Sequence, residues 1–195
     1  MLERWMSFHR AQHDIVLVRS KTELTAGDLL FLISCGEIID AKDRKKFSKT
    51  LVIHASDLPK GRGWSPHVWS IIEGASEITV TLLEAEDRVD SGAVWKKIKI
   101  EVPKHFLFYE INEVIFSAEY ELMNFAVENF FHISPVAQSE VASSYYPKRM
   151  PKDSELDPEK SIKSQFDLIR VSDPDRYPAF FKMHGHTYKM MIEKI

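Results

Sequence analysis

Two residues, His54 and Asp90, have the side chains and the setting to move a proton. His54 follows the apolar run of residues 51–53 and precedes a polar loop, so it should lie at the carboxyl end of a buried strand. Ligands of open α/β sheets bind beyond that end of the strands. Asp90 lies in a turn over residues 89–92, and an aspartate beside a histidine fixes its tautomer and supports its protonated form. We predict a catalytic pair; the ordinary alternatives are a core histidine bonded to a backbone carbonyl and a turn aspartate.

A basic turn with two glycines follows the histidine. It consists of Lys60, Gly61, Arg62 and Gly63 and leads into Trp64. Glycine lets the backbone approach a ligand closely, and the cations suit a phosphate group. The turn is therefore a candidate substrate-binding site, with a solvated surface loop as the alternative.

A second group of aromatic and basic residues lies farther along the chain. It contains Tyr145, Tyr146, Lys148 and Arg149. One tyrosine could stack on a nucleotide base while the cations hold a diphosphate. The alternative is that these side chains pack locally.

Composition limits the class of protein. The chain has 195 residues, 44% hydrophobic and 28% charged, which is ordinary for a globular protein with one sizeable core and a small appendage. A formal net charge of −3 argues against broad nucleic-acid or membrane binding by electrostatics alone. The single cysteine suits a reducing compartment. Since the sequence has no long apolar run and no secretion signal, we expect a cytoplasmic protein.

The apolar pattern predicts the elements that must position these groups. Near-continuous apolar runs predict buried strands at 14–18, 28–33, 50–54 and 77–85, and alternation predicts a half-exposed strand at 93–102. Helices are predicted at 40–47, 65–74, 106–131 and 158–170, the second with Ser65 as N-cap, Pro66 in the first turn and Gly74 at its end. Strands that alternate with helices favour an α/β fold with a mostly parallel sheet flanked by helices.

The last part of the chain predicts a small helix and hairpin extension. We expect a main domain over residues 1–133 and an extension over 134–195, ending in a β-hairpin that turns near Gly185. The hairpin has apolar residues on both strands and needs a surface to cover them, from the main domain or from a second subunit. His184 and His186 flank the turn, but no further ligand set accompanies them, so no metal site is predicted.

The ordered motifs resemble the formyltransferase family that uses 10-formyltetrahydrofolate, including methionyl-tRNA formyltransferases and nucleotide-sugar N-formyltransferases. That family has a strand ending in Asn-x-His, a Ser-Leu-Leu-Pro loop, an Arg-Gly pair and an Asp-Thr/Ala-Gly turn. Here His54 matches the histidine, residues 56–59 the loop, residues 62–63 the pair and residues 90–92 the turn. With further segments at 31–39, 145–157 and 166–181, the likeness spans residues 28–181.

The resemblance implies a formyltransferase-type α/β fold, with a shortened N-terminal unit, and assigns residues to two ligands. The formyl donor, 10-formyltetrahydrofolate, would contact Cys35, Gly36, Ile38, Leu58, Glu86, Val89 and Asp90. The acceptor would contact Lys60, Gly61, Arg62, Gly63, Trp64, Tyr145, Tyr146, Lys148 and Arg149. The resemblance also implies a homodimer formed partly through the C-terminal strands.

One departure from the family bears on catalysis. Formyl transfer to an amine requires removal of a proton and stabilisation of an oxyanion. His54 would accept the proton while Asp90 orients its ring, but Val52 stands where the family has its catalytic Asn and cannot donate a hydrogen bond. Residues 52, 54 and 56 of an extended strand face one side. Ser56 is therefore the candidate replacement, with a backbone N–H of the loop as its rival.

The leading hypothesis is an enzyme that transfers a formyl group from 10-formyltetrahydrofolate to a nucleotide-linked amino sugar. The closest resemblance is to short enzymes of pseudaminic and other nonulosonic acid pathways, which implies a UDP-linked 4-amino-4,6-dideoxy-N-acetyl-altrosamine. The alternatives are a formyl-folate hydrolase and a non-catalytic folate or nucleotide-sugar binding protein, which Val52 favours. A tRNA acceptor is disfavoured because the chain lacks the length and basic balance for a tRNA-binding domain.

Overall fold

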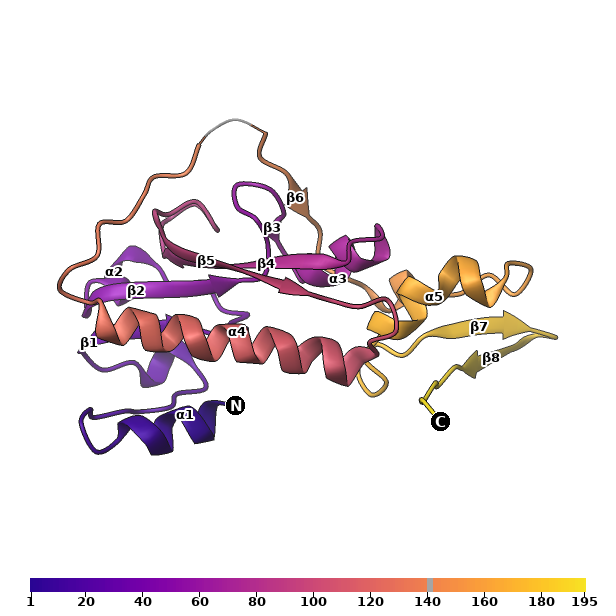
Figure 1. The fold of residues 1–195 in the computed structure, drawn as a ribbon, viewed down its shortest axis with the longest axis horizontal. Helices are drawn as coiled ribbons and strands as arrows, with labels where there is room; N and C mark the ends of the chain where they lie inside the picture. The colour runs from indigo at the N-terminus through magenta and orange to yellow at the C-terminus, as the bar shows by residue number, and fades with distance from the viewer. Residues whose placement is uncertain (140–141) are drawn as a thin grey trace.

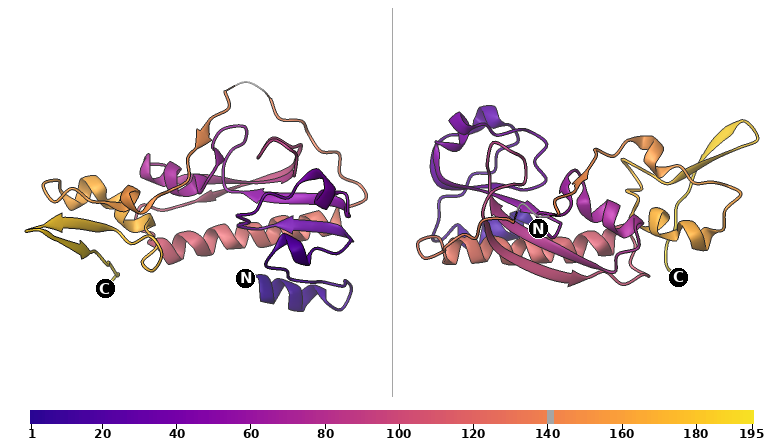
Figure 2. Two further views of the ribbon diagram at one scale, coloured as in Figure 1. Left: turned by 180° about the vertical axis from the view of Figure 1, so that it is seen from behind. Right: turned by 90° about the horizontal axis from the view of Figure 1, so that it is seen from above.

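A four-stranded sheet forms the centre of the molecule (Figure 1). The computed structural model describes residues 1–139 and 142–195. The strands are β1 (Gly27–Leu32), β2 (Phe47–His54), β4 (Glu77–Glu84) and β5 (Val94–Glu101), in the spatial order β1-β2-β4-β5. The long helix α4 (Phe108–Glu128) runs along one face of this sheet, as the views in Figures 1 and 2 agree. The predicted α/β class is confirmed.

The two faces of the sheet differ in character. Leu51 and Ile53 of β2 belong to the main hydrophobic core together with Ile115 and Leu122 of α4. Because alternate strand residues point to opposite faces, the even-numbered residues of β2, including His54, point away from α4. The predicted site therefore lies on the face that loops cover, opposite the long helix.

The prediction of a mostly parallel sheet is wrong. Only β1 and β2 are parallel, whereas β4 runs antiparallel to both β2 and β5. The helix between β2 and β4, α3 (Pro66–Ile72), has seven residues and is about 10 Å long. The eight residues of β2 extend about 26 Å, so this helix by itself does not span the length of the strand. The chain instead re-enters the sheet at the end where β2 leaves it.

Residues 14–18, predicted as a strand, form no regular element. Val16 is 71% exposed and Leu17 also lies at the surface, because this segment has no neighbouring strand to pair with. The residues before it form helix α1 (Leu2–His9), in which Trp5 Nε1 and His9 Nε2 donate to Oδ1 of Asn124 on α4, at 2.8 and 2.9 Å.

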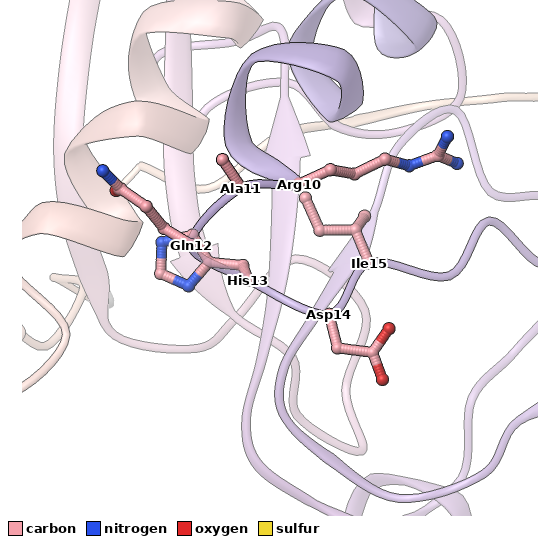
Figure 3. A pocket seen from close by; sticks show the side chains of 6 residues that line it. All are labelled: Arg10, Ala11, Gln12, His13, Asp14 and Ile15. Carbon is pink, nitrogen blue, oxygen red and sulfur yellow. The ribbon is translucent and has the colours of Figure 1, made fainter.

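A hollow of about 560 Å³ lies at the turn between α1 and this segment, lined by Arg10, Ala11, Gln12, His13, Asp14 and Ile15. Its side chains come from one stretch of chain and point in different directions (Figure 3). None of the residues predicted for the functional site lines it.

The other predicted elements form with shorter bounds. They are α2 (Ala41–Arg44), α3 and α5 (Ile162–Val171). At α3, Ser65 occupies the N-cap position, but its φ is +45° and its side chain makes no capping hydrogen bond. Pro66 is the first helical residue and Gly74, with φ of +96°, follows the helix end as predicted. Short elements complete the chain: η1 (Lys21–Glu23), β3 (Arg62–Gly63), β6 (Tyr145–Tyr146) and η2 (Pro151–Ser154).

The predicted hairpin is confirmed as β7 (Phe180–Met183) and β8 (His186–Lys189), at the end of the molecule opposite β1 (Figure 1). A small second core of Leu156, Ile169 and Ala179 receives Phe181 and Met190 from it. Part of its apolar surface is thus covered by its own chain, while Met183, Tyr188 and Met191 stay exposed. The domain boundary and the homodimer remain predictions.

No helix within residues 1–139 and 142–195 is both long enough and apolar enough to cross a membrane.

Candidate active site

The structure brings His54 and Asp90 together. His54 is the last residue of β2, and its ring is buried. A hydrogen bond between Nε2 and the carbonyl oxygen of Gly61, at 2.8 Å, orients the ring. Because a carbonyl only accepts hydrogen bonds, Nε2 carries a proton. Nδ1 faces Asp90 Oδ1 at 3.6 Å, slightly beyond hydrogen-bond distance, and the two groups form an ion pair when the ring carries a proton on both nitrogens. The histidine thus has the backbone carbonyl partner expected of a core histidine and also the carboxylate partner expected of a catalytic pair.

Asp90 is held in an uncommon backbone conformation. Its φ is +54°, a region that aspartate tolerates better than most residues. Its Oδ2 accepts a hydrogen bond from the Gly63 N–H at 2.9 Å, and its carbonyl oxygen accepts from Arg62 Nε at 3.1 Å. The second carboxylate oxygen, Oδ1, is therefore left to face His54.

Two arginines predicted to bind the acceptor are instead engaged within the protein. Arg62 is 6% exposed and, besides its bond to Asp90, donates from Nη2 to Gln138 Oε1 at 2.9 Å. Arg149 is buried, and its Nη2 donates to the Asp153 carbonyl oxygen and to Ser154 Oγ. Burial also lowers the pKa of the Arg149 guanidinium. Both guanidinium groups are thus held by hydrogen bonds within the protein, and their assignment to the acceptor remains a prediction.

Ser56 is buried beside the histidine, although not for the predicted reason. The strand ends at His54 and the chain bends, so the Ser56 N–H donates to the His54 carbonyl oxygen at 2.9 Å and strand alternation no longer applies. The Ser56 carbonyl oxygen accepts from Thr81 Oγ1 at 2.7 Å. The Ser56 hydroxyl is buried and has no hydrogen-bond partner. Its side chain lies against Gly61, where a Cβ would meet Ser56 Oγ at 3.4 Å.

The loop after His54 is held by polar residues of the neighbouring strands. In the sheet register Thr81 of β4 pairs with both His54 and Lys97 of β5, so all three side chains share one face. Lys97 Nζ donates to Asp57 Oδ1 and to the Leu58 carbonyl oxygen, both at 2.6 Å. Lys97 was missed from the sequence, although the alternation at 93–102 placed it on one face of its strand.

A second histidine near the site was also missed. His67 is half-buried in the first turn of α3. Burial, with added repulsion from His54 and Arg149, lowers its pKa from 6.5 to about 4. The imidazole of His67 is therefore neutral at pH 7.

The residues predicted for the formyl donor lie mainly on two exposed loops. Cys35, Gly36 and Ile38 follow β1, and Glu86 and Val89 follow β4. Leu58 differs from these residues because its side chain is buried. Its carbonyl oxygen accepts a hydrogen bond from Lys97, so the leucine supports the loop, and its contact with the donor remains a prediction.

Arg44 joins these two loops beside a cavity. Its Nη1 donates to the Ile39 carbonyl oxygen at 2.7 Å and its Nη2 contacts Asp87 at 2.5 Å. The cavity of about 310 Å³ is lined by Arg44, by Phe47, Ser48, Lys49 and Thr50 of β2, by Ala41 and Lys45, and by Glu84 and Ala85. Thr50 Oγ1 is buried without a partner, and Thr50 shares a strand face with His54.

The predicted acceptor residues divide into two groups. Tyr146 packs locally, as its alternative reading held: its hydroxyl donates to Glu73 at 2.6 Å and its ring stacks on Trp69. Burial and the bond to Glu73 raise the pKa of the Tyr146 hydroxyl. Tyr145 and Trp64 are 61% and 38% exposed.

The exposed aromatic pair has a compact arrangement. Arg62 and Gly63 of β3 pair in parallel with Tyr145 and Tyr146 of β6. The Tyr145 ring lies so close to Gly63 that a Cβ there would sit 2.7 Å from it. Lys148 Nζ lies 4.9 Å from the centre of the Trp64 ring. Residues from two distant parts of the sequence thus form one aromatic and basic surface, and Lys60, which is also exposed, lies in the turn that leads to Trp64.

No group of three or more His, Cys, Asp or Glu side chains that could hold a metal ion occurs in the part of the chain that the structure describes.

Comparison with known proteins gives the class to which this fold and site belong. Residues 7–127 match the family model described as formyl transferase, and the chain belongs to that family. The family predicted from the motifs is confirmed.

Individual relatives extend the likeness beyond the matched region. Methionyl-tRNA formyltransferase of Protochlamydia amoebophila is 27% identical over 173 residues, which cover 86% of this chain and 54% of that protein. The chain thus spans about half the length of the curated relatives it matches.

Solved structures show the same fold. Methionyl-tRNA formyltransferase from Clostridium thermocellum has a TM-score of 0.82 at 21% identity, covering 95% of this chain and 83% of its own. HypX from Aquifex aeolicus in complex with tetrahydrofolic acid has a TM-score of 0.67 at 25% identity, over 82% of this chain and 28% of that chain. A sugar N-formyltransferase from a Shewanella species has a TM-score of 0.70 at 18% identity, over 86% and 71%.

Proposed function

We propose that this protein transfers a formyl group from 10-formyltetrahydrofolate to the amine of a nucleotide-linked amino sugar. The observation that carries the proposal is the buried contact between His54 and Asp90 next to the exposed aromatic and basic surface of Trp64, Tyr145 and Lys148. Membership of the formyl transferase family supports the reaction class.

The proposed donor site is the pair of loops that Arg44 joins. Beside it lies a cavity of about 310 Å³ lined by Arg44 and by Thr50, whose buried Oγ1 has no hydrogen-bond partner, and HypX, a relative of similar fold, has been solved with tetrahydrofolic acid. Cys35, Gly36, Ile38, Glu86 and Val89 line the loops and would hold the donor. When bound, 10-formyltetrahydrofolate supplies the formyl group.

The proton of the reacting amine passes to the histidine–aspartate pair. Nε2 of His54 is bonded to the Gly61 carbonyl oxygen, so Nδ1 is the ring atom left for proton exchange, with Asp90 Oδ1 facing it. Once protonated, the ring is stabilised by the carboxylate and favours negative charge on the reacting oxygen. When the bond between the formyl carbon and the donor nitrogen breaks, the ring would return its proton to that departing nitrogen, so the step balances. Asp90 is thus a partner of the histidine throughout the reaction.

Ser56 is the proposed donor to the developing oxyanion. Val52 cannot donate a hydrogen bond, and loss of one oxyanion donor typically costs about 2.7–4 kcal/mol. The Ser56 hydroxyl is buried beside His54 and makes no hydrogen bond, so its O–H is available as a donor. Ser56 lies next to Gly61, and the carbonyl oxygen of Gly61 is bonded to His54, so the hydroxyl is close to the imidazole ring.

The exposed surface favours a nucleotide over a larger polyanion. Trp64 and Tyr145 offer ring faces to a base, and Lys60 and Lys148 offer charge to a diphosphate. A net charge of −3 gives little general attraction for a tRNA, although the curated relatives that the sequence matches are methionyl-tRNA formyltransferases. Two chemically distinct acceptors, a nucleotide-linked sugar and a tRNA, must therefore be compared directly in one assay.

The test is incubation with 10-formyltetrahydrofolate and a panel of UDP- and dTDP-linked amino sugars, with initiator methionyl-tRNA in parallel, followed by mass detection. We expect one sugar to gain one formyl group, and the His54→Asn variant to lose this activity. Formylation of the tRNA and of no sugar would refute the proposal that the acceptor is a nucleotide-linked amino sugar. Donor consumption without any acceptor would indicate a hydrolase, and ligand binding without turnover a binding protein.

A further inference from the structure

The segment that follows α4, described over residues 129–139 and 142–146, is tied to the sheet at Val136 and to the basic turn at β6. Val136 forms an isolated antiparallel bridge with Val94 at the start of β5, with both backbone hydrogen bonds present. At its other end, β6 pairs with β3 next to the basic turn. Figure 1 shows β6, at the end of this segment, on the side of the sheet opposite α4. Two of its side chains, Gln138 and Ser144, contact the backbone that holds the histidine–aspartate pair.

Gln138 uses its whole amide to hold the turn that contains Asp90. Its Nε2 donates to the carbonyl oxygens of Asp90 and Gly92, both at 2.9 Å, and its Oε1 accepts from Arg62 Nη2 at 2.9 Å. Arg62 Nε donates to the same Asp90 carbonyl oxygen. Since a non-glycine residue at φ of +54° persists only where its surroundings hold it, these bonds keep Asp90 Oδ1 turned toward His54.

Ser144 holds the peptide that orients His54. Its Oγ accepts from the Gly61 N–H at 2.8 Å, and its carbonyl oxygen accepts from the Arg62 N–H at 3.0 Å. The carbonyl oxygen of the same Gly61 residue accepts from His54 Nε2. A chain of contacts therefore runs from Ser144 through Gly61 to the imidazole.

We propose that Gln138 and Ser144 are positioning residues, which hold Asp90 and His54 respectively in the geometry for proton transfer. Both side-chain N–H groups of Gln138 are already bonded to backbone carbonyls, so the amide has no donor left for a ligand. The residues act through the catalytic pair and do not touch the reactants. The inference rests on the proposed function for its kinetic readout only, because the orientation of the His54 ring can be measured without turnover.

The test combines two variants with two readouts. Gln138→Met keeps the length of the side chain and removes all three hydrogen bonds, while Ser144→Ala removes one and is the milder change. Since a small misplacement of reacting groups can cost about 100-fold, we expect kcat to fall roughly 10- to 100-fold with KM for the donor nearly unchanged. The ring ¹⁵N resonances of His54 should also shift in both variants, as the bonds to Gly61 and Asp90 loosen.

A matched control lies far from the site. Gln165 makes the same kind of amide clamp, with Oε1 accepting from the Asp157 N–H at 2.7 Å and Nε2 donating to the Asp157 carbonyl oxygen at 3.0 Å. Gln165→Met should reduce thermal stability but leave kcat and the His54 resonances unchanged.

Unaltered His54 resonances in the folded Gln138→Met and Ser144→Ala proteins would overturn the proposal, whatever their stability. If Gln138→Met does not fold, the Ser144→Ala spectrum decides. Shifted resonances in a protein that shows no formyl transfer would uphold the positioning role and refute the proposed function separately.

Discussion

Glu119 on α4 should make the protein less stable as the pH rises. Its side chain is 6% exposed, its Oε2 has no hydrogen-bond partner, and burial raises the pKa of the carboxyl from 4.5 to about 7. Between these two pH values the folded protein binds a proton that the unfolded chain has released. Stability contributed by the neutral carboxyl is therefore complete below about pH 4.5 and is lost as the pH rises through 7.

The size of this loss follows from the shift. A change of about 2.5 pKa units corresponds to about 3 kcal/mol of unfolding free energy between pH 4.5 and pH 8.5. For a domain of this size, 1 kcal/mol moves the midpoint of thermal unfolding by about 2–4 °C. The wild-type midpoint should thus fall by roughly 6–12 °C more than that of Glu119→Gln, whose side chain stays neutral.

Thermal unfolding followed by circular dichroism at pH 5.0, 7.0 and 8.5 measures the difference. Glu113→Gln, an exposed substitution on the same helix, is the control and should follow the wild-type curve. Parallel pH curves for the wild type and Glu119→Gln would refute the reasoning, because they would mean that Glu119 has similar pKa values in the folded and unfolded states.

Other predictions concern the site and the assembly. His54→Asn should lower formyl transfer at least ~100-fold in a steady-state assay while acceptor affinity, measured by calorimetry, changes little; near-normal turnover would exclude the mechanism. Ser56→Ala should lower kcat by about 100-fold if its hydroxyl serves the oxyanion, and an unchanged kcat would point to a backbone donor. Trp64→Ala should raise KM for the acceptor and leave KM for the donor unchanged; the reverse pattern would move the acceptor surface elsewhere. Sedimentation at micromolar concentration should give a dimer that Tyr188→Lys weakens, whereas a monomeric wild type would place the exposed side of the hairpin in solvent.

Much of the site could be predicted from the sequence because its signals are local. The apolar run before His54 predicts the strand that carries it, and the turn residues around Asp90 predict a loop. The order of the motifs, with the basic turn and Pro66 following the histidine, identifies the family. Helix α4 follows from the 3.6-residue spacing of its apolar side chains, which the sheet then buries.

What only the tertiary structure decided depends on contacts between distant segments. The direction of β4 is given by its antiparallel pairing with β2 and β5, which periodicity does not encode. Residues 14–18 have the composition of a strand, but a strand exists only where a neighbour pairs with its backbone, and no segment within residues 1–139 and 142–195 does so here. Arg62 reads from the sequence as a free cation, yet 76 residues separate it from Gln138, the partner that engages its guanidinium. Propensity and motif report on neighbours in the chain, whereas burial and hydrogen bonding depend on neighbours in space, and those become known only when the chain is folded.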